Sequence, residues 1–239
     1  MRNFLMSWLL AVVALAFTSV KLSETTQQPA SGTPAATSAP DLSGVWIVRD
    51  FLVSISPKED PPFQPWAKAV YEARLRELAK SQADPDTPAE HCDTPPGLPR
   101  VMLWPLPWEV VQARDRVIII YEFESLVRQI FTDGRKHPGG LDPTYMGHSI
   151  GRYEGDTLVV DTIGFNDKTW VDLAGHLPHT EAFHLVERMR RIAHDTLEVD
   201  YTIDDPKAYT KPWTAQKIFK LKPDWQIKEY VCAENNQVR

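Results

Sequence analysis

The chain has 239 residues, of which 43% are hydrophobic and 24% are charged, a composition typical of a globular domain and not of a disordered chain. Its formal charge is −6, from 26 basic and 32 acidic residues, so no excess of cations is present to release counterions from a nucleic acid backbone. We therefore expect no nucleic-acid partner. Twenty prolines against eleven glycines favour β structure, because proline fixes φ and lacks the N–H donor that a helix interior needs.

The first twenty residues have the pattern of an export signal. Arg2 precedes an uncharged run over 3–20 whose apolar centre is as long as a signal-peptide core and short for a membrane span. We predict a signal peptide over 1–22, with an uncleaved anchor as the alternative, and a periplasmic or secreted protein without further membrane insertion. Residues 23–40, rich in Ser, Thr, Pro and Ala, predict a flexible linker, and 41–239 a single domain.

Cys92 and Cys232 are the only cysteines of the chain. In an exported protein an even pair favours a disulfide, and closing so long a loop stabilises by about 4 to 5 kcal/mol in the chain-entropy model. Two separate buried thiols are the alternative.

One helix is predicted over 65–81, where the sequence PWAKAVYEARLRELAKS begins with proline and is rich in strong helix formers. Its apolar face is expected to hold Trp66, Val70, Leu75 and Leu78. The segment 84–107 carries seven prolines, and we expect it to wrap over the domain surface.

Short apolar runs alternate with turn signals along the rest of the chain, which predicts antiparallel strands joined by tight turns. The strands are expected near 44–53, 108–113, 116–123, 125–132, 148–153, 157–165, 183–193, 196–204, 213–221 and 225–233. A meander of eight to ten strands removes its edges by closing into a barrel.

The first predicted strand begins Gly44-Val45-Trp46, and a G-x-W at this place resembles the lipocalin-like barrels, in which the tryptophan closes one end. The predicted fold class is therefore mainly β, a lipocalin-like antiparallel meander barrel with one inserted helix.

A second resemblance rests on longer motifs, HCDTPPGLPR, RQIFTDGRKHP, GHSIGRYEGDTLVVDTIGFND, ERMRR and TIDDPKAYTKPW. Together they cover most of 91–236 and resemble a functionally uncharacterised family of exported bacterial proteins. Tyr153 stands where that family is expected to have tryptophan, a conservative change. The resemblance implies export and no particular chemistry.

The segment Gly147-His148-Ser149-Ile150-Gly151 fits the nucleophile elbow of α/β-hydrolases, G-x-S-x-G. An elbow needs a buried strand before the serine and a helix after it, whereas a Gly/Pro-rich loop precedes this serine and a hairpin is predicted to follow. We interpret the segment as a turn and a strand, with serine hydrolysis as the minor alternative.

Five of the seven histidines lie between 137 and 184, including His176, His179 and His184. Such a group can assemble a zinc site, but glycine and proline between the histidines fix no common face. We expect no metal, and interpret these histidines as pocket-rim or turn residues.

Charged residues within the apolar alternation are candidate site residues. Glu187 alternates with Leu185 and Met189, and Glu229 with Ile227 and Val231, so both are predicted to point into the barrel. Arg128 and Asp161 can be assigned inward by the same rule, although their opposite faces are also apolar. A structural salt-bridge cluster or a solvated outer row is the alternative.

We expect the barrel to hold a small, partly apolar organic molecule without a cofactor, since no phosphate-binding or dinucleotide motif is present. The expected ligand-binding residues are Arg128, Arg152, His137, His179, Tyr121, Tyr201 and Glu229. One alternative is a cofactor-independent lyase, isomerase or cyclase that uses the same pocket, with Glu187, Asp161 or His148 moving a proton and Arg128 or Arg152 stabilising an anion. Another is a structural envelope protein that binds no ligand.

Overall fold

In the computed structural model, the residues described are 39–50, 54–55, 60–80, 96–173 and 177–231. All belong to one compact unit, Thr37–Arg239. The predicted signal peptide, nearly all of the predicted linker, Cys92 and Cys232 lie outside the described residues, so the leader, the linker and the disulfide stay predictions. Within the described residues, no helix combines the length and the apolar character needed to cross a bilayer.

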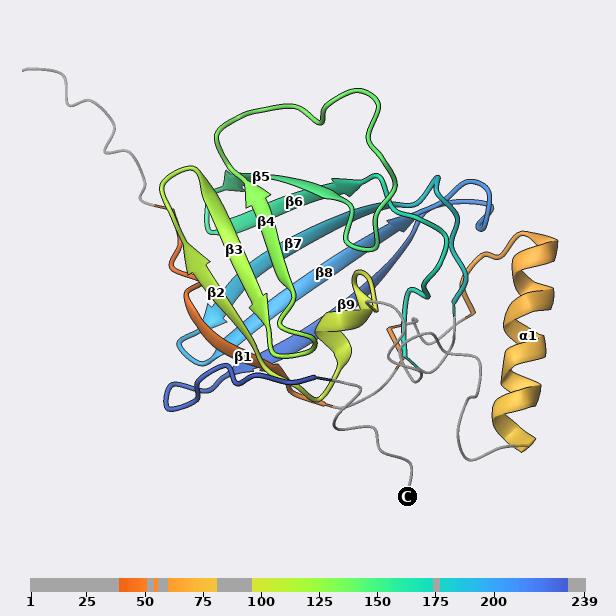
Figure 1. The fold of residues 1–239 in the computed structure, drawn as a ribbon, viewed down its shortest axis with the longest axis horizontal. Helices are drawn as coiled ribbons and strands as arrows, with labels where there is room; N and C mark the ends of the chain where they lie inside the picture. Colours follow the sequence, from red (N-terminus) through yellow and green to blue (C-terminus); the bar gives the residue numbers. More distant parts are fainter. Residues whose placement is uncertain (1–38, 51–53, 56–59, 81–95, 174–176, 232–239) are drawn as a thin grey trace, which may run out of the picture. The chain divides into compact units, whose positions relative to one another are not determined.

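The protein is a mainly β, lipocalin-like barrel (Figure 1), which confirms the predicted fold class. In the described part of the chain nine strands close into one ring, in which β9 pairs with β1. One α-helix, α1 (Pro65–Lys80), and one 3-10 helix, η1 (Arg100–Leu103), accompany them. The strands are β1 (Gly44–Val48), β2 (Trp108–Gln112), β3 (Arg116–Tyr121), β4 (Val127–Phe131), β5 (His148–Glu154), β6 (Thr157–Ile163), β7 (His184–Ala193), β8 (Thr196–Asp204) and β9 (Trp213–Leu221).

Alternation of buried and more exposed residues along the strands matches the sequence pattern. Every second residue of β3 and of β8 is buried, as expected when one face of a strand points into a barrel. Trp46 is fully buried and its indole N–H donates to the Leu42 carbonyl at 3.0 Å. The G-x-W tryptophan is therefore part of the core.

One strand pair departs from the predicted meander, because β5 runs parallel to β4. Only two residue pairs join them, Ile130 with Ser149 and Phe131 with Ile150. The prediction that a tight turn joins each strand to an antiparallel neighbour is therefore wrong after β4, where the turn signal is Asp133-Gly134. The chain instead makes a long excursion over 132–147 beside β5 and β6 (Figure 1) before β5 begins, and a parallel pair requires such a long connection.

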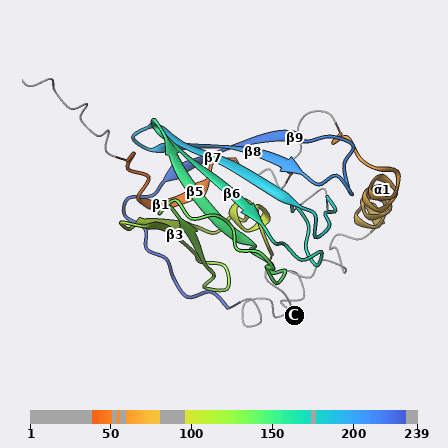
Figure 2. The ribbon, with the colours of Figure 1, turned by 90° about the horizontal axis from the view of Figure 1, so that it is seen from above.

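The end of the proline-rich segment does not wrap over the surface as expected. Residues Val101, Met102 and Leu103 of η1 are at most 2% exposed, and η1 is visible inside the ring of strands in Figure 2. The Tyr201 hydroxyl of β8 donates to the Met102 sulfur at 3.9 Å. The apolar residues between the prolines fill the barrel, because their burial outweighs the tendency of proline to break regular structure.

The predicted helix is confirmed to within one residue, but its buried face is not the expected one. Trp66 and Leu75 are exposed, whereas Ala67 is fully buried. Gln64, just before α1, donates its backbone N–H to the Ala208 carbonyl at 2.8 Å, and the Trp66 indole donates to the Lys207 carbonyl at 2.7 Å. Anchoring to the segment before β9 sets the rotation of α1, which helical periodicity alone did not reveal.

The last predicted strand, 225–233, does not form over its described residues. After Pro223-Asp224 the chain leaves β9 without pairing to it, and only Tyr230 makes an isolated bridge, to Phe123. Because β9 already pairs with β8 and β1, the closed ring offers no edge for a tenth strand.

We predict that Met102→Ala lowers the free energy of unfolding by about 2 to 5 kcal/mol, because it leaves a cavity inside the barrel. Leu75→Ala on the exposed side of α1 is the control and should cost less than about 1 kcal/mol. Urea denaturation measures both. Equal losses in the two variants would contradict the placement of η1 in the core.

Candidate functional site

Strands β5, β6 and β7 separate the predicted site residues onto two faces of the barrel wall. Thr162 and Glu187 are fully buried on the inner face, whereas Asp161 is partly exposed on the outer face. The register places Asp161 between Ile150 of β5 and Val186 of β7. The predicted proton-transfer residues therefore do not form one site, since Glu187 lies inside and Asp161 and His148 lie outside.

The inner face carries a buried ion pair, Arg128 of β4 with Glu187 of β7. The guanidinium donates from Nη1 to Oε1 of Glu187 at 3.1 Å and from Nη2 to Oε2, a two-pronged arrangement. It also donates from Nε to Ser149 Oγ and from Nη2 to Thr162 Oγ1, both at 3.0 Å. The side chains of Arg128 and Glu187 are 2% and 0% exposed. The inward assignment of Arg128 and Glu187 is thus confirmed.

Two tyrosines predicted to bind a ligand border this pair. Tyr121 of β3 and Tyr201 of β8 are both buried. Burial raises the pKa of Tyr121, and burial together with the Glu187 carboxylate raises the pKa of Tyr201, so both stay neutral at physiological pH. Burial by itself disfavours the charged guanidinium, but the Glu187 carboxylate raises the pKa of Arg128 above its ordinary value. The Arg128 guanidinium is therefore charged, and the pair is closed off from solvent.

Most of the guanidinium donors are already bonded to neighbouring strands, so the inner cluster acts as a cross-link. From β4, Arg128 contacts β5 through Ser149, β6 through Thr162 and β7 through Glu187. It thereby holds together the part of the wall in which only two residue pairs join β4 and β5.

We predict that Glu187→Gln destabilises the fold by about 3 to 5 kcal/mol, because it leaves the Arg128 cation buried without its counter-charge. The matched control is Glu154→Gln, which removes an exposed carboxylate paired with Arg152 and Arg188 and should cost less than about 1 kcal/mol. Chemical denaturation provides both values. A neutral Glu187→Gln would show that the ion pair contributes nothing to folding.

On the outer face, three predicted site residues meet in one chain of hydrogen bonds. His137, from the 132–147 segment, contacts Oδ1 of Asp161 through Nε2 at 2.9 Å and Nδ1 of His148 through its own Nδ1 at 2.8 Å. His184 of β7, interpreted from the sequence as a pocket-rim or turn residue, has its Nε2 3.2 Å from Oδ2 of Asp161. We call His137, His148, Asp161 and His184 the outer cluster.

The sequence could not reveal the outer cluster as a unit, because His137 reaches it only through the long connection between β4 and β5. Alternation along β6 does place Asp161 opposite Thr162, but both faces of that strand are apolar enough to leave the assignment open. The signal available was the spacing of His148 and His184 on strands that flank β6.

His148 is half-buried, so its ring is packed against the protein and still reaches solvent. The ring stacks on Phe131 with centroids 5.6 Å apart. Burial, and then the neighbouring His137 and Arg135, lower the pKa of His148. The imidazole is therefore neutral at physiological pH.

The other histidine and arginine predicted to bind a ligand lie elsewhere. His179 is buried beside Phe183 and contacts Thr169 Oγ1 at 2.9 Å, so it is a core residue and not a pocket residue. Arg152 is exposed and pairs with Glu154 on its own strand. His176 lies outside the described residues. The segment GHSIG contains the start of β5, as predicted, and not a strand-to-helix elbow.

We predict that the free energy of unfolding falls as the pH drops from 7 to 5, in part through His179. Burial lowers the pKa of His179 in the folded protein, so below about pH 6.5 the unfolded chain takes up a proton that the native state refuses. Each such group costs up to about 1.4 kcal/mol per pH unit. His179→Gln should flatten the dependence, whereas His194→Gln, on an exposed turn, should leave it unchanged. An unaltered slope in the first variant would be the contrary result.

Glu229 does not point into the barrel as predicted, but is exposed. Its segment has no strand partner to impose alternation, so the apolar spacing around it carries no information about faces. The same segment instead forms one wall of a surface pocket.

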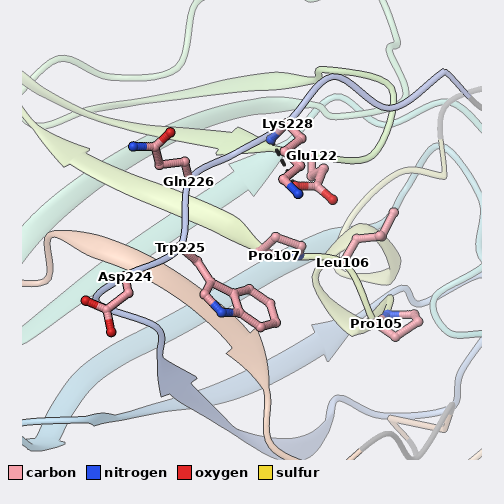
Figure 3. Close-up of a pocket in the computed structure, with 8 residues that line it drawn as sticks. All are labelled: Pro105, Leu106, Pro107, Glu122, Asp224, Trp225, Gln226 and Lys228. Carbon is pink, nitrogen blue, oxygen red and sulfur yellow. Dashed lines mark hydrogen bonds between the residues drawn. The ribbon is translucent and has the colours of Figure 1, made fainter.

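This pocket has a volume of about 410 Å³ and lies between the start of β2, the end of β3 and the segment after β9 (Figure 3). We call it the Trp225 pocket. The Lys228 backbone N–H donates to Oε2 of Glu122 at 3.0 Å, which joins two of its walls. Its lining comprises Pro105, Leu106, Pro107, Glu122, Asp224, Trp225, Gln226 and Lys228.

No three His, Cys, Asp or Glu side chains of the described residues are arranged to hold a metal ion. No protein-family model matches the chain, and no curated protein matches it either. The resemblance to a family of exported proteins therefore stays a prediction.

Proposed function

We propose that the protein is an exported β-barrel that binds a small, partly apolar organic molecule in the Trp225 pocket. A volume of about 410 Å³ lies within the roughly 300 to 1,000 Å³ range of small-molecule sites. The barrel fold is compatible with ligand binding, and the apolar run after Arg2 supports export. The interior holds a buried ion pair whose donors are mostly bonded already, so we place the ligand outside the barrel interior.

The observation that carries the proposal is the exposed indole of Trp225. Trp225 is 46% exposed although a tryptophan gains much by burial, and it lies between Asp224 on one side and Pro105 and Pro107 on the other (Figure 3). The Lys222 ammonium lies 5.1 Å from the ring centroid. An aromatic ligand can stack on the indole while an acidic substituent contacts Lys222 or Lys228.

Proton transfer in the same pocket, the alternative predicted from the sequence, has less support. The pocket is lined by Glu122 and Asp224 but by none of Glu187, Asp161 or His148. We therefore propose binding without turnover at this site.

We predict that 8-anilinonaphthalene-1-sulfonate, an aromatic anion, binds the folded protein and that Trp225→Ala weakens its affinity at least about tenfold, a loss of roughly 1.4 kcal/mol. Trp66→Ala is the matched control, because Trp66 is 44% exposed on α1 and lies outside the pocket. Fluorescence titration measures both affinities. Equal weakening by the two substitutions, or none by either, would contradict a site at Trp225.

A further inference from the structure

The outer cluster lies apart from the Trp225 pocket and is not explained by it. Its residues come from β5, β6, β7 and the segment 132–147, whereas the pocket is built from residues 105–107, 122 and 224–228. Within the cluster, His137 connects a carboxylate to a second imidazole. A structural role alone does not require two histidines in series on a partly solvated face.

With one proton on each ring, the hydrogen bonds fix which nitrogen carries it. Asp161 accepts from Nε2–H of His137 at 2.9 Å, so a neutral His137 carries its lone pair on Nδ1. The proton in the 2.8 Å contact between the two Nδ1 atoms must then belong to His148. It follows that Nε2 of His148 has no proton and presents a lone pair.

We propose that His148 is a general base, which removes a proton from a weakly acidic C–H group of a small organic molecule through its Nε2 atom. His137 and Asp161 are positioning residues, because they act only through His148. In the step, the C–H bond breaks, its electron pair stays with the substrate, and the proton bonds to Nε2. The resulting imidazolium faces the Asp161 carboxylate through His137, which stabilises the charge.

The surroundings suit this role. Phe131 packs against one face of the His148 ring and fixes its orientation, as a base must be held to act on a bound proton. Arg135 stacks on the same phenylalanine with its guanidinium carbon 3.8 Å from the ring centroid, and pairs with Asp133. Burial, His137 and Arg135 all lower the pKa of His148, which keeps its imidazole neutral. His184 contacts the far oxygen of Asp161 and completes the set of groups facing the carboxylate.

The inference is tested with 5-nitrobenzisoxazole, a carbon acid that needs no cofactor. When a base removes its C–H proton, the C–H electron pair turns the C=N bond into a nitrile, the N–O bond breaks, and the ring opens to a coloured cyanophenolate. We expect His148→Gln to lower kcat/KM at pH 7.5 by at least about tenfold. His194→Gln is the control, because His194 is exposed on the turn between β7 and β8, and it should leave the rate unchanged. Equal rates for the wild-type protein and His148→Gln would overturn the proposal.

The variant Asp161→Asn tests whether Asp161 positions His148 or is only structural, because only a positioning role changes the pH dependence of the rate. In the wild-type protein, activity should rise with pH and level off above a midpoint below 6.5, because only neutral His148 is a base. Loss of the carboxylate charge should reduce the plateau and move the midpoint to lower pH, since the imidazolium loses its stabilising anion. An unchanged rate and midpoint would show that Asp161 has no part in the reaction.

The protonation of His148 can be measured without substrate, independently of how well the probe binds. Nitrogen-15 NMR of the histidine side chains at pH 7.5 should show His148 protonated on Nδ1 and free on Nε2. A proton on Nε2 would overturn the proposal, as would stoichiometric zinc binding that His148→Gln abolishes. Dye binding at Trp225 and the elimination rate at His148 are separate readouts, so failure of the pocket proposal and failure of this one are distinguishable.

Discussion

The ion pair between Arg128 and Glu187 is the interaction on which the barrel wall depends. Parallel pairing of β4 with β5 supplies only two residue pairs, which is little backbone hydrogen bonding for a closed ring. Arg128 compensates by bonding through its side chain to each of the next three strands. Burying two charges is costly, and the cost is met only because the guanidinium and the carboxylate are bonded to each other in a two-pronged geometry and to further polar groups.

A closed interior has consequences for where chemistry can occur. Since η1 fills the barrel and the ion pair is shielded from solvent, ionisable groups that can meet a substrate must lie on the outside. Successive side chains of a strand point to opposite faces. Thr162 therefore points into the barrel, whereas its neighbour Asp161 points outward. The same wall therefore serves as a cross-linked support on one face and a set of titratable groups on the other.

Predictions from the sequence were correct where buried and exposed residues alternate along a paired strand. They were wrong where contacts with distant segments, and not the local pattern, set the structure. Glu187 was placed correctly because its neighbours on β7 alternate with polar residues, and β7 pairs on both sides. Glu229 shows the same local spacing but has no strand partner, so nothing enforces the period. The rotation of α1 and the approach of His137 to Asp161 depend on contacts with distant segments, and these leave no local pattern to find.

Arg128 and Glu187 are expected to stabilise the barrel as a pair and not as separate side chains. A double-mutant cycle with Arg128→Met, Glu187→Leu and the double variant tests it directly by equilibrium denaturation. We expect each single change to be strongly destabilising and the double variant to be more stable than the sum of the single effects predicts, by more than about 2 kcal/mol, because it leaves neither charge buried alone. Additive effects would contradict the claim and would show that the two side chains contribute independently.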